Sequence, residues 1–581
     1  MFKINKMKAI QRSLLTGFLC LACIACSKSR DRGDFLETFN TDFKSELAGL
    51  HVSNAAYAVF SRDSVILQDS FSASGAGTDG DSPFLIGSVT KVFTAVAIMQ
   101  LHQEGKIDLD RPVTDYVPDF QIRQRFPDSP PITLRAVLTH HAGIPSDNYL
   151  HKFSKTPNDF NDLLDYLNTQ YTCYPAGEIW AYSNLGYALL GVVIERVSGI
   201  KYEEYIAQHV FMPLGMNSSG FYSDYDRQKH LSAAFDDEGN PEEELPLYDK
   251  PAGAIYSTVN DMTRFGRSFI DGKEIILRNE TIEQMFELQN ADNLLDLDHR
   301  SAICFNYKNK AWELGRLLEH GGATLYHRAQ LTIAPDAGLA CVLLSDSPNG
   351  KDNAWKLDEQ LMAEYCKRSG ITPDRSLNRE KKMQFTPVSS KNLQSFAGSY
   401  AMPGLVCRID WKHNLLSPTI EGQNFYLAQH DSGSFVPAKR FMGMLFKSKR
   451  MFFLLEEIDG GEHFIQAMPW GGLTIIGTRT DPQPIPEKWK ARAGDYKVSN
   501  AAAEDAPTIE KLTISVEDGL MVLRYGFNPD ISFGQNASVA LDPANENEAF
   551  VLGYGRGGGE SVVFGPDGSS CSFMGLIFKR I

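Results

Sequence analysis

The chain has 581 residues, a net charge of −15, 43% hydrophobic residues and 22% charged residues. This composition predicts a folded protein of several domains, because one ordinary domain holds about 100 to 200 residues. The negative charge argues against nucleic acid and anionic lipid as main partners, and no basic patch offsets it.

The first 26 residues predict a signal peptide of the lipoprotein type. Four basic residues precede an apolar run over residues 13–25, which is too short for a comfortable membrane span. Ala25-Cys26 resembles a bacterial lipoprotein cleavage box, so Cys26 is the predicted lipidation site. Cys23 is a competing site, and plain secretion or an uncleaved anchor is the alternative. We therefore expect an exported protein, periplasmic or at the cell surface, that is anchored to a bacterial membrane by its lipid, with a tether over residues 27–44.

The other cysteines predict neither a metal site nor an assignable disulfide. They are widely scattered and show no CxxC or Cys/His ligand spacing, and no HExxH motif occurs in the chain. We expect no metal and no cofactor. These six residues are Cys173, Cys304, Cys341, Cys366, Cys407 and Cys571.

A helix start carries the first candidate catalytic pair. Residues 55–60 and 65–67 predict a β-hairpin. From Val89 apolar residues recur at helical spacing, so Ser88 stands at the start of a buried helix with Lys91 one turn later on the same face. A lysine in apolar surroundings can lose its charge and accept the serine proton. The alternative is that Ser88 caps the helix and Lys91 extends to water.

Two further segments carry polar side chains at the ends of predicted elements. Tyr182 and Asn184 precede a nearly all-apolar helix over residues 185–197, whose apolar surface predicts a central position in the fold. As ordinary structural residues, they would be an interface aromatic and a helix cap. Residues 312–318 and 331–333 predict strands, with His320-Gly321-Gly322-Ala323 between them at a sheet edge.

The carboxy-terminal third predicts a different fold. After a linker over residues 371–392, short aromatic runs alternate with glycine turns. Residues 396–400 are echoed by 493–496, and 472–479 by 575–580, which indicates a duplicated all-β unit over residues 393–484 and 485–581. Each copy forms its own barrel, or the two close one barrel together; the sequence does not decide.

Taken in order, the three motifs resemble those of the serine beta-lactamase and penicillin-binding-protein superfamily, which are SxxK, YxN and HxG. The likeness is greatest to its class C branch, with the D-alanyl-D-alanine carboxypeptidase, D-aminopeptidase and esterase relatives, and it places the hydrolase domain at residues 45–370. It implies an α+β fold, with an antiparallel sheet flanked by helices beside a helical subdomain. The all-β region resembles the lipocalin-like domains of some relatives.

The resemblance also implies a role for each matching residue. Ser88 would be the nucleophile, Lys91 its proton partner, and Tyr182 a second base with a phenolate stabilised by Lys91. Asn184 would orient a substrate amide. His320 would assist Tyr182 or bind a substrate carboxylate.

The strand after His320 would bind substrate through Gly321, Gly322 and Ala323, and the backbone N–H groups of Ser88 and Ala323 would form an oxyanion hole. The chain then departs from many relatives, because bulky residues follow Ala323. We expect Tyr326 and His327 to narrow the cleft.

We therefore predict a secreted serine hydrolase that cleaves amides or esters through an acyl-serine. Its substrates would be small peptides with D-amino acids, including peptidoglycan fragments, or small acyl esters, with β-lactams as a rival class. The alternative outside enzymes is a non-catalytic penicillin-binding or peptidoglycan-binding protein. An α/β-hydrolase is disfavoured because no GxSxG motif occurs. The oligomeric state is not predicted.

Overall fold

The computed structural model describes residues 34–581 except 76, 155–158, 223–230, 309–311, 352–353, 375–392, 421–422, 430–433, 442–443, 448–451, 468–471, 502–507 and 528–535. The predicted signal peptide, Cys23, Cys26 and most of the predicted linker therefore lie outside the described residues. Within the described ranges, every helix is too short or too polar to cross a membrane.

A six-stranded antiparallel sheet organises the amino-terminal part. Its order is β2-β1-β11-β10-β9-β8. Side chains of β1 alternate between two cores, with Tyr57 and Val59 on one face and Ala58 and Phe60 on the other, as strand geometry requires. The strand bounds are β1 Asn54–Ser61, β2 Val65–Ser72, β8 Asn306–Tyr307, β9 Leu318–Ala323, β10 Arg328–Ala334 and β11 Leu339–Ser345.

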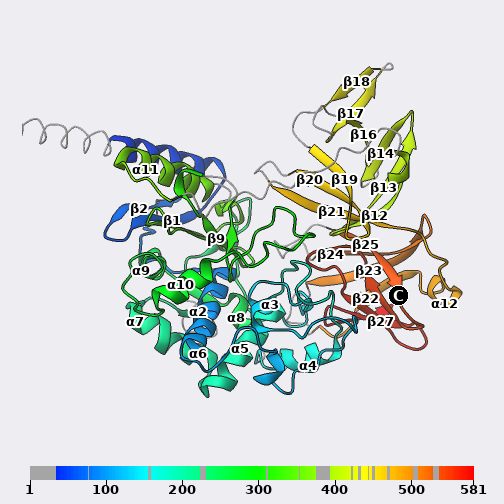
Figure 1. The fold of residues 1–581 in the computed structure, drawn as a ribbon, viewed down its shortest axis with the longest axis horizontal. Helices are drawn as coiled ribbons and strands as arrows, with labels where there is room; N and C mark the ends of the chain where they lie inside the picture. Colours follow the sequence, from blue (N-terminus) through cyan, green and yellow to red (C-terminus); the bar gives the residue numbers. More distant parts are fainter. Residues whose placement is uncertain are drawn as a thin grey trace, which may run out of the picture.

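Helices cover both faces of this sheet. The helix over residues 34–49 lies beside α11 (Ala363–Ser369) on one face (Figure 1). Phe43, Tyr57 and Leu361 belong to the core that they close. On the other face α9 (Val259–Ser268) packs against β1 and β11. The helical subdomain continues from this second face.

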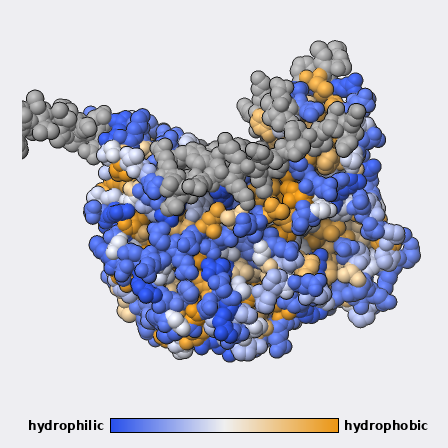
Figure 2. Space-filling view, in the orientation of Figure 1, coloured by the Kyte–Doolittle hydropathy of each residue, from blue (hydrophilic) through white to orange (hydrophobic). Residues whose placement is uncertain are grey.

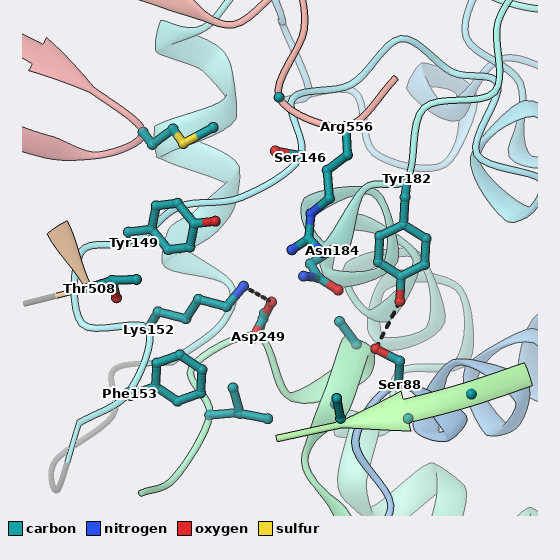
Figure 3. A pocket seen from close by; sticks show the side chains of 18 of the residues that line it. Ser88, Ser146, Tyr149, Lys152, Phe153, Tyr182, Asn184, Asp249, Thr508 and Arg556 are labelled. Carbon is teal, nitrogen blue, oxygen red and sulfur yellow. Dashed lines mark hydrogen bonds and ion pairs between the residues drawn. The ribbon is translucent and has the colours of Figure 1, made fainter. Parts of the chain in front are cut away.

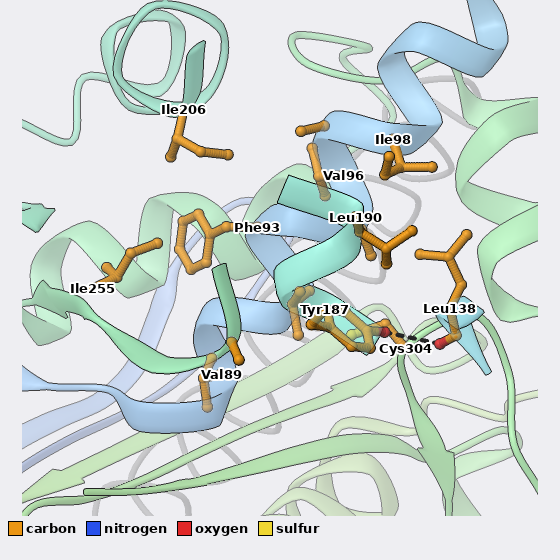
Figure 4. Packing of buried hydrophobic residues seen from close by; sticks show 14 of the residues in the cluster. Val89, Phe93, Val96, Ile98, Leu138, Tyr187, Leu190, Ile206, Ile255 and Cys304 are labelled. Atoms are coloured by element: carbon orange, nitrogen blue, oxygen red, sulfur yellow. Dashed lines mark hydrogen bonds between the residues drawn. The ribbon is translucent and has the colours of Figure 1, made fainter. Parts of the chain in front are cut away.

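The subdomain is built around two buried helices, α2 (Thr90–Gln103) and α5 (Asn184–Ser198), which contact each other. Figure 4 shows their side chains interleaved, and Phe93 of α2 stacks on Phe265 with ring centroids 3.8 Å apart. The remaining elements are α3 Leu134–Leu138, α4 Asp162–Thr169, α6 Tyr202–Ile206, α7 Met212–Leu214, α8 Lys250–Gly253, α10 Asn279–Phe286, β3 Phe84–Leu85, β4 Gly220–Phe221, β5 Ala234–Phe235, β6 Pro241–Glu242 and β7 Ile255–Ser257.

The first carboxy-terminal unit is a ring of strands. β13 pairs with both β12 and β14, which joins the two ends of the sheet order β13-β12-β21-β20-β19-β17-β16-β14. The bounds are β12 Gly398–Met402, β13 Leu405–Lys412, β14 Leu415–Ile420, β15 Gln423–Asn424, β16 Tyr426–Gln429, β17 Phe435–Phe441, β18 Met444–Lys447, β19 Phe452–Ile458, β20 Gly461–Ala467 and β21 Leu473–Thr480.

The second unit, which we call the C-terminal barrel, is a closed barrel of strands β22 to β29. It lies beside the helical subdomain (Figure 1). Its elements are α12 Glu487–Lys490, β22 Gly494–Val498, β23 Ile509–Glu517, β24 Leu520–Phe527, β25 Ala537–Pro543, β26 Glu548–Val551, β27 Ser561–Phe564, β28 Ser570–Phe573 and β29 Leu576–Arg580.

Both units have the same hydrogen bond at their first strand, from a tyrosine hydroxyl to the carbonyl oxygen four residues earlier. Tyr400 Oη donates to the Phe396 carbonyl oxygen at 3.1 Å, and Tyr496 Oη donates to the Arg492 carbonyl oxygen at 2.9 Å. These tyrosines are the residues that the sequence echo pairs. The question left open by the sequence is therefore answered, because each copy closes a ring of its own.

The expected α+β domain followed by β-barrels is confirmed, but one expected strand is wrong. Trp312–Leu314 forms a 3-10 turn, and β9 begins only at Leu318. Gly315, with a φ of 76°, interrupts the extended chain between them.

On the face shown in Figure 2, hydrophilic side chains predominate and hydrophobic ones form scattered groups. The six cysteines outside the signal are free and buried.

Candidate active site

Ser88 lies on the wall of a cavity of about 580 Å³. It sits in a 3-10 turn, Gly87–Val89, that leads directly into α2. Lys91 follows one turn later and is fully buried. Its Nζ donates to three oxygens, Ser88 Oγ at 3.1 Å, Asn184 Oδ1 at 2.7 Å and the Ala252 carbonyl at 2.7 Å. The buried start of the helix thus holds the Lys91 amine within hydrogen-bond distance of the Ser88 hydroxyl.

Burial changes the proton affinity of Lys91. Loss of water around the ammonium lowers its pKa to about 7, although the Asp249 carboxylate opposes this effect. Near neutral pH the side chain is therefore divided between its charged form and a neutral form that can accept a proton.

Tyr182 approaches Ser88 from the other side (Figure 3). Its Oη donates to Ser88 Oγ at 2.8 Å. The next residue, Ser183, caps α5 by accepting from the Gly186 N–H at 2.8 Å, which fixes the chain just outside the helix. The His140 ring packs on Tyr182 with centroids 4.3 Å apart. The phenol is thereby held against the serine.

The electrostatics of Tyr182 differ from the sequence expectation of a phenolate. Burial raises the pKa of its phenol above the ordinary value, and the hydrogen bond to Ser88 and the charge of Arg556 only partly oppose this. Lys91 Nζ lies 4.9 Å from the centre of the ring rather than on the oxygen. The resting tyrosine is therefore protonated and acts as a hydrogen-bond donor.

The edge strand β9 contacts the serine turn closely. β8 pairs with Leu318 and Glu319 of β9, and His320 to Ala323 continue past it along the sheet edge beside Ser88. A Cβ on Gly87 would lie 2.5 Å from the Ala323 backbone nitrogen. Ser88 and Ala323 thus lie close together on the cavity lining, where the sequence analysis predicts an oxyanion hole.

A glycine-to-alanine pair tests this close approach. A Cβ on Gly322 would overlap the Ile86 carbonyl oxygen, whereas one on Gly321 would meet only the end of the Gln330 side chain at 3.2 Å. Gly322→Ala is expected to lower the free energy of unfolding by about 1 to 3 kcal/mol, and Gly321→Ala by much less. Thermal or urea unfolding measures both. Equal losses of stability in the two variants would contradict the close contact between Gly322 and Ile86.

His320 and Asn184, two other predicted site residues, line the same cavity, but the charge of His320 and the hydrogen bonds of Asn184 differ from those expected. Burial lowers the pKa of His320 to about 3, with Lys91 adding to the effect, so its ring is neutral and offers no cation for a carboxylate. Asn184 uses both ends of its amide inside the protein, because Nδ2 donates to Asp147 Oδ1 at 2.7 Å and Oδ1 accepts from Lys91.

The expected narrowing by Tyr326 and His327 is not observed. Both side chains are buried, and neither lines the cavity. The buried Glu244 carboxylate holds the turn after β9 instead, accepting from Thr324 Oγ1 at 2.8 Å and from the Tyr326 N–H at 3.0 Å. The turn is therefore folded away from the opening.

The sequence analysis missed a group of buried charges beside Asn184. Asp147 is fully buried and accepts from Arg556 Nη2 at 2.6 Å and from Lys152. Burial alone raises the pKa of the Asp147 carboxyl, but Arg556 and Lys152 outweigh it and hold the pKa below the ordinary value. Asp147 is therefore a carboxylate. Lys152 also reaches Asp249 Oδ2 at 3.3 Å.

Arg556 comes from the C-terminal barrel, which supplies one wall of the cavity. It lies in the segment between β26 and β27, where Gly559 contacts Cys173 so closely that a Cβ would lie 2.5 Å from the Cys173 carbonyl oxygen. In the sequence, the glycine-rich run over residues 553–559 is the signal that could have shown this close approach of the barrel to the helical subdomain. Other residues of the barrel on this wall are Thr508, Tyr525, Phe527, Gly557 and Met574.

Glu560, beside this segment, predicts a pH-dependent stability. It is buried and accepts from the Ser146 N–H at 2.7 Å and Ser146 Oγ at 2.8 Å, yet burial raises its pKa to about 7. An unfolded glutamate loses its proton near pH 4.3, whereas the folded protein keeps this proton until about pH 7. The free energy of unfolding therefore falls by about 3 kcal/mol as the pH rises to 7.

Replacing this carboxyl with an amide removes that loss. The free energy of unfolding of Glu560→Gln relative to the native protein is expected to increase between about pH 5 and pH 8. Urea unfolding at several pH values measures the difference. The test is the difference in the free energy of unfolding between the two proteins. The pH dependence of one protein alone is not sufficient, because buried histidines such as His320 make stability rise with pH and oppose the effect of Glu560. A pH-independent difference would contradict the prediction.

Ser88 at a helix start, Lys91, Tyr182 and the edge strand β9 meet around one cavity, which is the arrangement expected for the serine hydrolases of the resembled superfamily. Residues 39–363 match the sequence profile of the family described as Beta-lactamase. The chain belongs to the beta-lactamase family, and the predicted resemblance is confirmed.

Relatives and solved structures agree with this assignment. The chain is 33% identical over 207 residues to "Putative penicillin-binding protein PbpX" of Bacillus subtilis (strain 168), a match that covers 35% of this chain and 50% of the relative. A structure titled "Crystal structure of SurE" aligns with a TM-score of 0.55 at 19% identity, over 76% of this chain and 99% of that one. The octameric penicillin-binding protein homologue from Pyrococcus abyssi aligns with a TM-score of 0.51 at 21% identity, over 75% and 99%.

Proposed function

We propose that this protein cleaves amide or ester bonds through an acyl intermediate on Ser88. The observation that carries the proposal is the placement of Ser88 Oγ, 3.1 Å from the Lys91 amine and 2.8 Å from the Tyr182 hydroxyl, on the wall of a cavity of about 580 Å³. A hydroxyl held between a proton acceptor and a proton donor is suited to nucleophilic attack.

The proton transfers follow from the charge states of the two neighbours. Neutral Lys91 accepts the Ser88 proton as Oγ attacks the substrate carbonyl carbon, and the N–H groups of Ser88 and Ala323 stabilise the oxyanion. Protonated Tyr182 then gives its proton to the leaving nitrogen or oxygen as that bond breaks, which leaves a Tyr182 phenolate and a Lys91 ammonium in the acyl-enzyme. Water releases the acyl group by the reverse proton transfers.

The cavity wall supports a substrate with an apolar group. Opposite Ser88 and Tyr182, aromatic side chains of Tyr149 and Phe153 point into the cavity (Figure 3), with Phe527 and Met574 on the same lining. A small peptide with an apolar D-amino acid or an apolar acyl ester fits this lining. The penicillin-binding relative and a fold neighbour titled "Crystal structure of SurE with D-Leu" support the peptide class. Peptidoglycan fragments and β-lactams remain substrates to be compared.

Mass spectrometry after incubation with a fluorophosphonate and, separately, with a labelled penicillin tests the proposal. We expect a fluorophosphonate adduct on Ser88 that is absent from Ser88→Ala. A preference between the two reagents separates an esterase from a penicillin-reactive enzyme. Absence of both adducts would favour a non-catalytic binding protein and overturn the proposal.

For the location of the protein, we propose export and lipid attachment at Cys26. The support is the basic and apolar pattern of residues 1–26. Detergent phase partitioning of the full chain tests it. Cys26→Ser is expected to move the protein to the aqueous phase, and Cys23→Ser is the matched control. The opposite pattern would assign the lipid to Cys23.

A further inference from the structure

A continuous chain of hydrogen bonds joins the C-terminal barrel to the nucleophile. It begins at Arg556, whose Nη2 and Nε donate to Asp147 Oδ2 at 2.6 and 3.1 Å. Asn184 Nδ2 donates to the other oxygen of Asp147 at 2.7 Å. Asn184 Oδ1 then accepts from Lys91, which reaches Ser88.

We propose that Arg556 is a positioning residue for the reaction, which acts on Lys91 through Asp147 and Asn184. The inference rests on the proposed function, because it concerns the group that accepts the Ser88 proton. It also makes the C-terminal barrel a necessary part of the active site.

The argument turns on the orientation of one amide. An ionised carboxylate only accepts hydrogen bonds, so Asp147 must face the Asn184 NH₂ group, and the amide oxygen must then face Lys91. The reversed amide would place two N–H donors against the Lys91 amine. Arg556 and Lys152 hold the pKa of Asp147 below its ordinary value and so keep this carboxylate ionised. Arg556 thereby fixes the direction in which Lys91 is held.

Arg556 also acts on Lys91 through its charge. The charges that act on Lys91 come from several elements: Asp249 and Cys304 raise its pKa, and Lys152 and Arg556 lower it. His140 and His320 nearby have pKa values below their ordinary range, so both rings are neutral near pH 7. Removing Arg556 alone therefore raises the pKa of Lys91, because a positive neighbour is lost.

Other contacts hold the same barrel segment without reaching Lys91, and they provide a matched control. Tyr174 Oη donates to the carbonyl oxygens of Gly553 and Gly555 at 3.0 and 3.1 Å. Tyr174→Phe removes these bonds but leaves Asp147 and Asn184 untouched. A purely structural role of Arg556, in which it only docks the barrel, predicts the same effect for both substitutions.

The test is the pH dependence of Ser88 modification by an uncharged fluorophosphonate in the full chain. An uncharged reagent excludes any role of Arg556 in binding a substrate anion. In Arg556→Gln, the pH at which the rate reaches half its plateau is expected to rise by about half a pH unit, less than a directly contacting charge causes. Arg556→Lys keeps the charge and should restore the native value. Tyr174→Phe should show no shift.

Three results would overturn the inference: an unchanged midpoint in Arg556→Gln, an equal shift in Tyr174→Phe, or an equal shift in Arg556→Lys. Each of them leaves the proposed function intact as long as the native protein is labelled on Ser88. Absence of labelling in the native protein would instead overturn the proposed function, and this inference with it.

Discussion

Replacement of Lys91 with methionine is expected to lower the rate of Ser88 acylation by about 10³-fold, within the range that a general base contributes. Methionine fills the same buried space but cannot accept a proton. In the native protein the rate should rise with pH through about 7, because burial lowers the pKa of Lys91 to that value and the neutral amine is the active form. Lys91→Met should lack this rise. Stopped-flow or quenched labelling across the pH range measures it.

Lys91→Arg provides the control for charge without basicity. A guanidinium remains protonated in proteins, so this variant retains a cation near Ser88 but offers no base. We expect it to be as impaired as Lys91→Met. A Lys91→Arg protein with more than about a tenth of native activity would show that Lys91 acts through its charge rather than as a base.

Loss of the Tyr182 hydroxyl is expected to reduce turnover at least 100-fold, since the leaving group then lacks its proton donor. Tyr182→Phe removes only the oxygen that lies 2.8 Å from Ser88 Oγ. The effect should be larger for amides than for esters with good leaving groups, because an amine must be protonated to depart. Steady-state kinetics with a matched amide and ester pair measures both.

Tyr187→Phe is the matched substitution for this experiment. Tyr187 lies one turn into α5, and its Oη donates to the Leu138 carbonyl oxygen at 2.8 Å (Figure 4). We expect its effect on turnover to be below threefold. A loss below threefold in Tyr182→Phe itself would rule out its role as the proton donor.

The local parts of the site could be predicted from the sequence because short spacings determine them. Ser88 and Lys91 are one helical turn apart, and Tyr182 and Asn184 flank the cap of α5, so backbone geometry alone places each pair. The charge states could not be predicted in this way. The protonated Tyr182 and the neutral His320 result from burial, which depends on how distant segments pack.

The link between Asp147 and Arg556 was beyond prediction for a different reason. The two residues are 409 positions apart in the sequence, and no local pattern relates them. Asp147 lies in a loop and Arg556 in a glycine-rich segment of a barrel that the sequence analysis assigned to a separate domain. Only the docking of the two domains creates the ion pair.

One wall of the cavity comes from the C-terminal barrel, so it is synthesised last. Its lining residues are Thr508, Tyr525, Phe527, Arg556, Gly557 and Met574. A nascent chain that has emerged as far as β11 already carries the serine, lysine, tyrosine and edge strand, but the cavity still lacks that wall. The cavity is therefore complete only when the last strands have been translated and folded. A chain cut short before residue 508 would keep Ser88 and Lys91 but lose Arg556, the residue that we infer orients Lys91.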